Sequence, residues 1–400
     1  MAPSRNIIVA GAGIGGLTAS LALAQRGFRV MLLDQAERLE ETGAGIQLSP
    51  NATRVLIGLG LEQRLLTDIV EPAAVDIRTS QGRLLARVPL GDYAAERYGA
   101  PYWVSHRGDL QAALLEAVRG SPDIVLKLGT RVEDFVAHGH GVTVACRHGT
   151  STADETGIAL IAADGLRSGL RARLGHYGKP IFRHRTAWRA LILAASVAPD
   201  MRTEVVRLWL GRGAHLVHYP VKAGALINIV AIVDDRWDQP GWGEAGARQE
   251  IIARFSGRRW AESARELVAV PERWVKWALY DLPPLRRWGN GPVTLLGDSA
   301  HPMLPFLAQG AAMAIEDAAV LAASLARNPD DIPGAMRRYE RERRRRTAKA
   351  QRGARRNSRT YHLAGSQAVL RNLYLWAAGG KMLLRSYDWL YNWRPAPPKA

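Results

Sequence analysis

The sequence predicts an α/β fold with a β-rich insertion, and three patterns along its 400 residues lead to this fold class. The chain opens with an apolar run, a glycine-rich turn and a helical pattern. Its middle consists mostly of short strand patterns separated by turn residues. A further apolar strand, a loop with Pro and Gly, and a long helical stretch follow. We therefore expect the opening domain to be split, with its last strand and helix after the insertion.

The first residues predict a βαβ unit. Asn6–Ala10 and Phe28–Asp34 are short apolar runs that are typical of buried strands. Between them, Ile14–Arg26 has a helical pattern that stops at Gly27. The apolar stretch Ile7–Ala24 also has the length of a signal peptide or membrane anchor, but its glycine-rich turn would break a spanning helix. The sequence therefore predicts a Rossmann-like, dinucleotide-binding opening and no transmembrane segment.

Strand patterns recur through the rest of the chain, separated by clusters of turn residues. A long helix is expected from Ala311 onward, after the last strand. The expected strands are Ala74–Thr79, Leu84–Val88, Val142–Cys146, Ile158–Ala163, Val205–Leu210, His215–Val221, Leu226–Val233 and Val293–Leu296.

Composition and charge restrict the class of protein. With 47% apolar and 23% charged residues, the chain is typical of globular proteins rather than disordered or fibrous ones. Its formal net charge of +17 suits nucleic acid, an anionic membrane surface or anionic small molecules. Much of the excess lies in Arg337–Arg346 and Arg352–Arg356. Because glutamates alternate with arginines at helical spacing in the first run, we interpret it as a solvated helix face and expect no nucleic-acid partner.

The cysteine content and the C-terminal region add two expectations. Cys146 is the only cysteine, so no intramolecular disulfide or cysteine metal cluster can form, and a reducing cytoplasm is the simplest compartment. Ala368–Trp393 carries Leu, Tyr and Trp at roughly helical spacing. This pattern favours core packing or a homodimer face over a membrane surface or another partner. We expect no metal site and no membrane partner.

The turn after the first strand fits the pattern G-x-G-x-x-G. Gly11 makes the tight turn, Gly13 lets the backbone approach a pyrophosphate, and Gly16 lets helix and strand pack closely. The helix N-terminus at Ile14 favours the phosphate charge. Asp34 ends the next strand and can accept a hydrogen bond from a free ribose 2′-hydroxyl. The pattern predicts a dinucleotide site but does not separate FAD from NAD.

Two later segments distinguish these cofactors. Ala163–Ser168 (ADGLRS) and Gly297–Pro305 (GDSAHPMLP) follow the glycine turn in that order. They resemble the paired DG and GD fingerprints of the single-component flavoprotein aromatic hydroxylases. Gly297–Ala318 is most similar to salicylate hydroxylases and 3-hydroxybenzoate 6-hydroxylases, with 6-hydroxynicotinate monooxygenase nearby. The resemblance runs from about Ile7 to about Arg346.

This resemblance implies one Rossmann-like domain that holds FAD, while NAD(P)H binds transiently near the DG segment. It also implies a monooxygenase that uses NAD(P)H and O2 to hydroxylate a small phenolic aromatic acid through a C4a-hydroperoxyflavin. NADH is expected rather than NADPH. The division then expected is an FAD-binding domain in residues 1–73, 101–180 and 281–330, a β-rich substrate domain in 74–100 and 181–280, and C-terminal helices in 331–400.

The resemblance carries over several cofactor residues. Asp298 would lie near the flavin ribitol and pyrophosphate. Gly310 and Ala311 would open a helix whose positive end faces the isoalloxazine ring and stabilises the charge of reduced flavin.

The remaining cofactor residues lie elsewhere in the chain. Arg107 resembles the family arginine that contacts the FAD phosphate, and Asp164 resembles the residue that orients FAD and NAD(P)H. Arg38 either flanks the adenosine end or forms an ordinary surface ion pair.

The substrate residues are expected on one strand. His215 and Tyr219 are four residues apart, so their side chains share a face of the strand, whereas His218 points to the other face. The segment resembles the substrate-domain strand of the family, whose His and Tyr line the ring pocket. We therefore predict His215 as the base or hydrogen-bond acceptor for the phenol and Tyr219 as a wall of the pocket. The alternative for His215 is an ordinary structural histidine.

Three further residues bear on the substrate. Arg189 binds either a substrate carboxylate or a neighbouring acidic side chain. Gln47 is expected near the flavin and the substrate, where pyridine-hydroxylating relatives tend to carry histidine, and this difference favours benzoate-type substrates. Pro305 resembles a residue beside the flavin where the 3-hydroxybenzoate enzymes carry glutamine, which weakens that specific assignment.

Other functions stay open at this point. Within the hydroxylases, decarboxylating hydroxylation, hydroxylation without loss of carboxylate, and hydroxylation of urate or a pyridine are all compatible with the sequence. Other flavin chemistry, such as halogenation or epoxidation, is a further alternative. A basic FAD-containing protein without enzyme activity would instead show salt-sensitive retention on DNA or lipid.

Overall fold

A six-stranded sheet forms the nucleotide-binding side of the protein, in the order β18-β19-β11-β1-β2-β7. The computed structural model describes residues 6–39, 44–239 and 243–395. Strand β1 pairs in parallel with β2 and β11, and β19 pairs in parallel with β11, so the last strand does return after the long insertion. The strands are β1 (Asn6–Ala10), β2 (Arg29–Leu33), β7 (Ile124–Lys127), β11 (Ala159–Ala162), β18 (Gly289–Asn290) and β19 (Val293–Leu295).

Helices cover this sheet and carry the phosphate turn. Helix α1 packs against both α5 and α9, and α9 also packs against α2. The predicted helix Ile14–Arg26 ends earlier, at Ala24, with Gln25 as its C-cap. The helices of this part are α1 (Ile14–Ala24), α2 (Pro50–Gly58), α3 (Glu62–Leu65), α4 (Gly91–Tyr98), α5 (Arg107–Arg119), α6 (Gly169–Arg173) and α9 (Gly310–Arg327).

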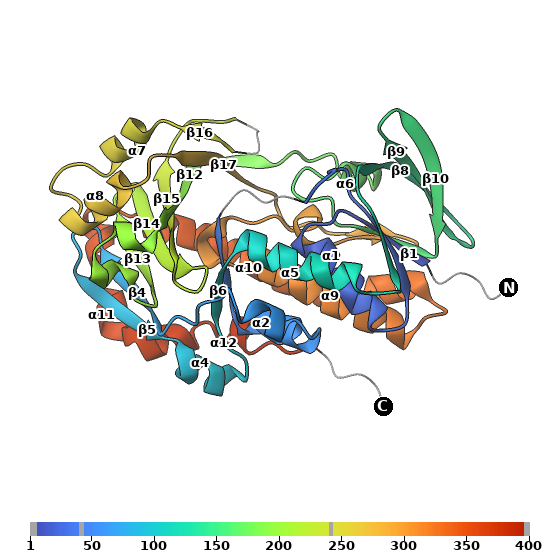
Figure 1. Ribbon diagram of the computed structural model, residues 1–400, viewed down its shortest axis with the longest axis horizontal. Coiled ribbons are helices and arrows are strands. Elements are labelled where there is room, and N and C mark those ends of the chain that lie inside the picture. The colour runs from blue at the N-terminus through green and yellow to red at the C-terminus, as the bar shows by residue number, and fades with distance from the viewer. Residues whose placement is uncertain (1–5, 40–43, 240–242, 396–400) are drawn as a thin grey trace.

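A three-stranded antiparallel sheet stands at the end of the molecule beyond β1, at the right of Figure 1. Buried Cys146 lies on its middle strand and is a free thiol. The strands are β8 (Thr130–His138), β9 (Gly141–His148) and β10 (Ser151–Gly157).

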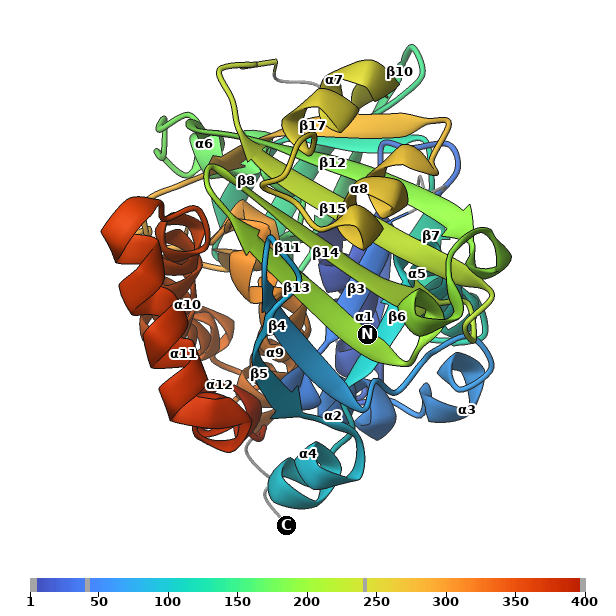
Figure 2. The ribbon, with the colours of Figure 1, turned by 90° about the vertical axis from the view of Figure 1, so that its left-hand side faces the viewer.

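The inserted β-rich region forms an eight-stranded sheet in the order β16-β17-β12-β15-β14-β13-β4-β5. Strands β4 and β5 come from early in the chain and join this sheet where β4 pairs in parallel with β13. Helices α7 and α8 cover one face of the sheet, and its other face turns toward α9, β3 and β6 (Figure 2). The elements are β4 (Ala74–Thr79), β5 (Leu84–Pro89), β12 (Ile181–Leu193), β13 (Val205–Gly211), β14 (Ala214–Val221), β15 (Leu226–Asp234), β16 (Glu244–Gly246), β17 (Trp274–Asp281), α7 (Arg248–Arg254) and α8 (Glu262–Ala269).

A short strand pair joins the two large sheets. Strand β3 (Gly45–Leu48) pairs antiparallel with β6 (Trp103–His106). The backbone N–H of Gly45 donates to Asn228 Oδ1 on β15 at 2.7 Å. A side chain at Gly45 would lie 2.7 Å from the Tyr219 hydroxyl, so glycine permits this close approach. The β3–β6 pair is thus held against the eight-stranded sheet at the place where the predicted site residues lie.

The C-terminal helices run along both sheets (Figure 1). Helix α10 has 30 residues and therefore spans about 45 Å. Near its start Tyr339 donates to the carbonyl of Leu295 on β19 at 3.1 Å, and near its end Ser358 Oγ accepts from Arg185 on β12 at 2.7 Å. The helices are α10 (Ile332–Tyr361), α11 (Gly365–Arg385) and α12 (Asp388–Tyr391), and the short 3-10 helices of the chain are η1 (Ala194–Ser196), η2 (Pro199–Arg202), η3 (Gly297–Ser299) and η4 (Pro305–Leu307).

The run Arg337–Arg346 is not simply a solvated helix face, and that interpretation of the sequence was wrong. The side chain of Arg343 is fully buried and lies 2.6 Å from both Glu316 and Asp317 of α9. Arg346 also contacts Glu316 at 2.6 Å. Two carboxylates buried on α9 require counter-ions, and α10 supplies them because it packs along α9. The arginine run therefore belongs partly to the interior.

The apolar C-terminal region is divided between core and surface. Its second half packs inward, which agrees with the predicted core role, whereas its first half lies exposed on α11. The homodimer face stays a prediction. The buried residues are Leu383, Leu384, Leu390 and Tyr391, and the exposed ones include Val369, Leu370, Leu373, Tyr374 and Trp376.

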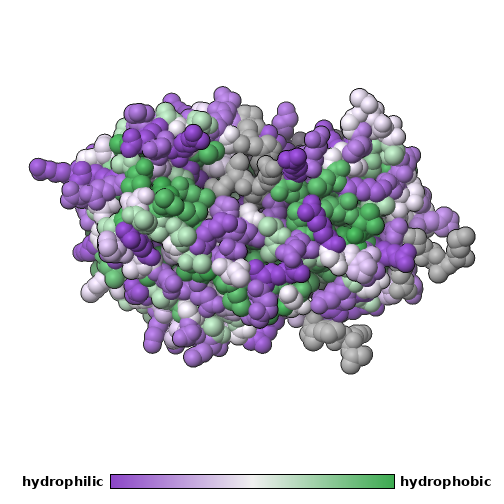
Figure 3. Space-filling view, in the orientation of Figure 1, coloured by the Kyte–Doolittle hydropathy of each residue, from purple (hydrophilic) through white to green (hydrophobic). Residues whose placement is uncertain are grey.

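The described part of the chain has no helix with enough length and apolar character to cross a membrane. Within the same residues, no group of three or more His, Cys, Asp or Glu side chains is placed to hold a metal ion. The face in Figure 3 mixes hydrophilic and hydrophobic residues over most of its area. The architecture confirms the predicted α/β fold class with a large β-rich sheet and C-terminal helices.

Candidate active site

The phosphate turn has the steric features that the glycine pattern predicts. Gly11 has φ +109°, and a Cβ there would lie 2.4 Å from the Ala163 carbonyl oxygen. A Cβ on Gly16 would lie 1.8 Å from the Gly11 carbonyl oxygen, so helix and strand pack without room for a side chain. A Cβ on Gly13 would meet nothing within 4 Å. The turn is therefore closed at its ends and open in the middle, as a bound pyrophosphate requires.

Asp34 stands directly after β2 and braces this turn. Its Oδ2 accepts the backbone N–H of Ala12 at 2.5 Å, and its Oδ1 accepts the N–H of Ala36 at 2.8 Å. Each carboxylate oxygen can accept a second hydrogen bond, so a ribose hydroxyl can still bind there. Arg38 is exposed a few residues further on.

The DG and GD segments are bound to each other. Ser299 Oγ donates to Asp164 Oδ1 at 3.0 Å and accepts the backbone N–H of Gly165 at 2.8 Å. Buried Arg171 donates to the carbonyls of Ser299 at 3.0 Å and Leu166 at 2.7 Å. The sequence prediction missed Ser299 and Arg171, because only the folded chain brings these two segments together.

Asp298 lies in the short helix η3, close to the N-terminus of α9. A Cβ on Gly310, the first residue of α9, would be 4.0 Å from Asp298 Oδ1. Solvent reaches this carboxyl, yet the surrounding protein removes enough hydration to raise its pKa, against the positive charges of His301 and Arg107. A solvent-accessible carboxylate and the N-terminus of α9, at Gly310 and half-buried Ala311, thus lie side by side, and the charge of Arg107 acts on the same carboxylate.

A buried polar network holds α9 in place beside Asp298. The Asp317 carboxylate lies 2.5 Å from His301 Nε2 and 2.6 Å from Arg343 Nε. Burial alone would raise the pKa of Asp317, but these two neighbours hold it below its usual value. Gln309, the N-cap residue, accepts from Asn51 at 3.2 Å. The network fixes the position of the helix N-terminus.

The predicted substrate residues share one face of the eight-stranded sheet. Val217 pairs with Val230, and Val230 pairs with Arg189, so Arg189 faces the same side as residues 215, 217 and 219. His218 is on the opposite face, where its ring stacks on Trp209. Burial and the nearby Arg207 lower the pKa of His218 to about 3, so it is a neutral core residue.

Gln47 and Tyr219 meet between the two sheets. Gln47 Oε1 accepts from the Tyr102 hydroxyl at 2.8 Å, and Gln47 also hydrogen-bonds Tyr219. Tyr219 is buried, and burial raises the pKa of its hydroxyl above the usual range although the Arg189 charge opposes this. The Arg189 guanidinium carbon lies over the Trp277 ring, 5.0 Å from its centroid. Tyr219 therefore stays protonated at neutral pH.

His215 lies where β14 meets the loop that follows the GD segment. Its ring centroid is 5.1 Å from that of Phe306, in the short helix that Pro305 begins, and 5.4 Å from that of Tyr361. Burial, followed by the charges of His362 and Arg185, lowers the pKa of His215 well below its usual value. The imidazole is therefore neutral, and one of its two ring nitrogens can accept a hydrogen bond.

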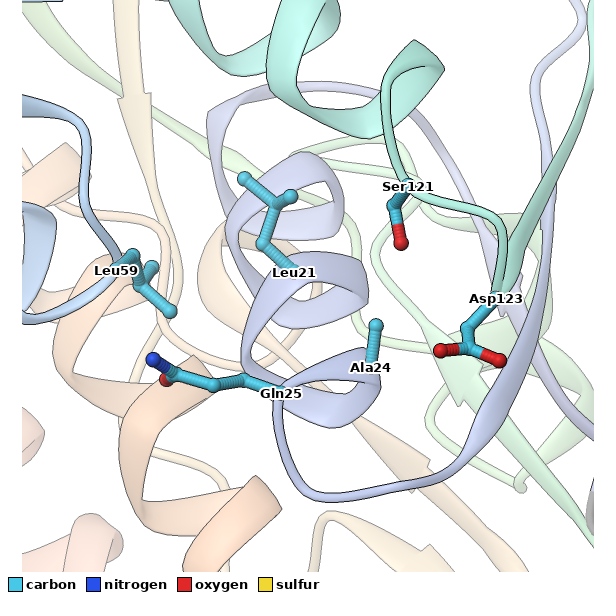
Figure 4. Close-up of a pocket in the computed structure, with 6 residues that line it drawn as sticks. All are labelled: Leu21, Ala24, Gln25, Leu59, Ser121 and Asp123. Atoms are coloured by element: carbon cyan, nitrogen blue, oxygen red, sulfur yellow. The ribbon is translucent and has the colours of Figure 1, made fainter.

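A surface pocket lies away from the predicted site residues. Figure 4 shows it at the C-terminal end of α1, at the opposite end of that helix from the glycine turn. It is lined by Leu21, Ala24, Gln25, Leu59, Ser121 and Asp123.

Fold and site together define a flavin-dependent oxidoreductase, since the glycine turn, the linked DG and GD segments and the α9 terminus fit FAD. Residues 5–354 match the protein family described as FAD binding domain, and the chain belongs to that family. It is an FAD-dependent monooxygenase, as are its named relatives.

The relatives span nearly the whole chain. The 3-hydroxybenzoate 6-hydroxylase of Polaromonas naphthalenivorans (strain CJ2) is 37% identical over 397 residues, which cover 97% of this chain and 96% of the relative. A 3-amino-4-hydroxybenzoate 2-monooxygenase of Streptomyces platensis is 36% identical over 394 residues, with 98% and 96% covered.

Solved structures agree with this assignment. Klebsiella pneumoniae HpxO complexed with FAD and uric acid superposes with a TM-score of 0.84 at 26% identity, over 96% of this chain and 95% of that one. A salicylate hydroxylase substrate complex gives a TM-score of 0.81 at 28% identity, over 98% and 97% of the two chains.

Proposed function

We propose that this monooxygenase uses NADH and O2 to hydroxylate a small phenolic acid of the hydroxybenzoate or salicylate type. The observation that carries the proposal is the shared sheet face of His215, Tyr219 and Arg189, which turns toward Gln47 and Pro305 at the flavin side. This face offers a neutral base, a hydroxyl and a cation to one small ligand.

Each of these groups has a part in binding or proton transfer. His215 takes the proton of the ring hydroxyl, which makes the ring carbon ortho or para to it more nucleophilic. Arg189, whose guanidinium lies over the Trp277 ring, binds the carboxylate of the acid. Tyr219 and Gln47 hydrogen-bond each other and form the wall of the pocket. The burial of His215 and Tyr219 keeps water away from the ring.

The residues predicted to bind FAD would lie on the flavin side of this site. Gly11, Gly13 and Gly16 would hold the pyrophosphate on the N-terminus of α1, with Asp34 on the ribose. When bound, FAD would take hydride from the nicotinamide and activate O2.

The remaining cofactor residues would act near the ring and the phosphates. Asp298 and Arg107 would contact the ribitol and phosphate region, and Gly310 and Ala311 would face the ring. Asp164 would orient the flavin and NADH, and Arg38 would flank the adenosine.

An N-heterocycle is the second candidate substrate. It is favoured by the similarity to HpxO, whose structure contains uric acid. Arg189 would then bind a ring carbonyl or an anionic ring instead of a carboxylate.

The test measures NADH and NADPH consumption by the flavin-loaded protein with salicylate, 3-hydroxybenzoate, 4-hydroxybenzoate, 6-hydroxynicotinate and urate. Products are identified by mass spectrometry. A phenolic acid that accelerates NADH oxidation and gives a hydroxylated product in matching amount supports the proposal. Hydroxylation of urate or hydroxynicotinate alone would establish the second candidate, and peroxide without product would contradict both.

A further inference from the structure

A chain of three side chains connects the buried His215 with the protein surface. His215 Nδ1 lies 2.8 Å from His362 Nε2, and His362 Nδ1 lies 2.5 Å from Asp234 Oδ1. His215 is 2% exposed and the His362 side chain is also 2% exposed, whereas the Asp234 side chain is 50% exposed. Three ionisable groups at hydrogen-bond distance thus lead from the interior to solvent.

The three residues come from separate elements that meet at one corner of the sheet. His215 lies on β14, Asp234 ends β15, and His362 is the C-cap of α10. The carbonyl of His362 accepts the N–H of Gly213 at 3.3 Å, and Arg371 donates to the carbonyl of Tyr361 at 2.9 Å. These bonds fix the end of α10 against the sheet, so the alignment of the three groups is part of the packing.

We propose that Asp234 and His362 form a proton relay that carries the substrate proton from His215 to solvent. The inference rests on the proposed function, because it needs a ligand hydroxyl at His215. His362 and Asp234 are positioning and relay residues here, since neither touches the substrate.

The transfer balances with two neutral imidazoles. The ring O–H bond of the substrate breaks and its proton binds His215 Nε2, while the Nδ1 proton of His215 passes to His362 Nε2. The Nδ1 proton of His362 then passes to Asp234 Oδ1 and on to water. The reverse transfers return a proton to the product oxygen and restore the starting tautomers. A phenolate stays bound and no net charge accumulates on the buried histidines.

The charges around the relay suit this direction. Arg185 Nε on β12 lies 3.1 Å from Asp234 Oδ1. The positive charge of Arg359 on α10 lowers the pKa of Arg185, and that of Arg371 on α11 lowers the pKa of His362. Burial alone would raise the pKa of Asp234, but His362 and Arg185 hold it below its usual value. Burial lowers the pKa of His362, against the opposing effect of Asp234. A proton therefore does not rest on either histidine, and an exposed carboxylate exchanges it with water.

The relay is tested without turnover, on the oxidised flavin-loaded protein mixed rapidly with 3-hydroxybenzoate, or with whichever phenolic acid the wild-type protein hydroxylates. Phenolate absorbance reports loss of the ring proton, and a pH indicator in weak buffer reports proton release to solvent. Asp234→Asn keeps the size of the side chain but removes its proton exchange, and Asp234→Glu keeps a carboxylate. His362→Gln removes the middle group.

The expected result is that Asp234→Asn and His362→Gln slow proton release and phenolate formation about tenfold, which is below the full contribution of a general base. The dissociation constant of the ligand should stay unchanged, formate should restore the rate of Asp234→Asn, and Asp234→Glu should resemble the wild type. Matched controls are Asp154→Asn and His138→Gln, which remove an exposed carboxylate and an exposed imidazole far from the site.

Wild-type rates in both relay variants, or equal slowing by Asp234→Asn and Asp234→Glu, would overturn the relay. Failure of the proposed function can be distinguished from failure of the relay, because the wild-type protein itself would then bind and hydroxylate no phenolic acid.

Discussion

The proposed flavin side and the proposed substrate side of this protein are built by different means. On the flavin side, backbone geometry sets the site: glycines at positions 11 and 16 admit no side chain, and buried parallel strands hold them. On the substrate side, the backbone is an ordinary antiparallel sheet, and the site depends on which side chains point from one face. A site set by backbone geometry tolerates little change, whereas a site set by side chains can acquire a new substrate by substitution.

The largest effect is expected at the glycine turn. Gly16→Ala would place a methyl group 1.8 Å from the Gly11 carbonyl oxygen, so the turn must open. We expect loss of bound FAD and destabilisation on the order of 4 kcal/mol. The matched control is Gly13→Ala, which meets no protein atom within 4 Å and should fold normally with weaker FAD binding. Flavin content and urea unfolding measure both, and a fully flavin-loaded Gly16→Ala protein would show that the backbone is not the constraint.

The next prediction compares substitutions of two histidines on opposite faces of β14. His215→Asn should lower kcat by about 10²–10⁴-fold while the protein stays folded, since it removes the base. His218→Asn should retain kcat per folded molecule and lose stability instead, because His218 packs against Trp209 and Arg207 in the core. Steady-state kinetics beside thermal unfolding separates these outcomes. Equal loss of kcat in both variants would mean that the sheet face does not define the substrate site.

The third prediction concerns stability alone and tests the packing of α10 against α9. Arg343→Met leaves Glu316 and Asp317 buried with fewer counter-charges and should cost about 3–5 kcal/mol of unfolding free energy. Exposed Arg345 in the same run is the control, and Arg345→Met should change stability by less than about 0.5 kcal/mol. Similar values for the two variants in urea unfolding would restore the interpretation of the run as a solvated face.

Much of the fold could be predicted from local patterns. The apolar runs at β1, β2, β13, β14, β15 and β19 fall within a residue or two of the predicted strands, because buried strands require such runs. Strand β12 was missed, since Arg183, His184, Arg185 and Arg189 interrupt its apolar residues. The three arginines reach carboxylates and an aromatic ring that lie far away in the sequence.

Only the part of the site that stands in local motifs could be predicted from the sequence. The glycines, Asp164 and Asp298 stand in motifs whose spacing is local, and the structure brings the two motif segments into contact. His362 lies 147 positions after His215, and no local pattern connects them. Arg343 was misjudged because alternation of Arg and Glu looks the same on an exposed helix and on one that neutralises a buried partner. Long-range electrostatics is the part that a single sequence does not display.

The position of α10 along the chain also sets an order of assembly during synthesis. Strand β19, which completes the nucleotide-binding sheet, and His362, which reaches the substrate sheet, leave the ribosome after all other strands of both sheets. The nucleotide-binding sheet therefore stays unfinished until β19 emerges, and the complete substrate sheet lacks its contacts with α10 until the last helices emerge. Chaperones that bind exposed strand edges would act in that interval, and a slow stretch of translation before residue 293 would prolong it.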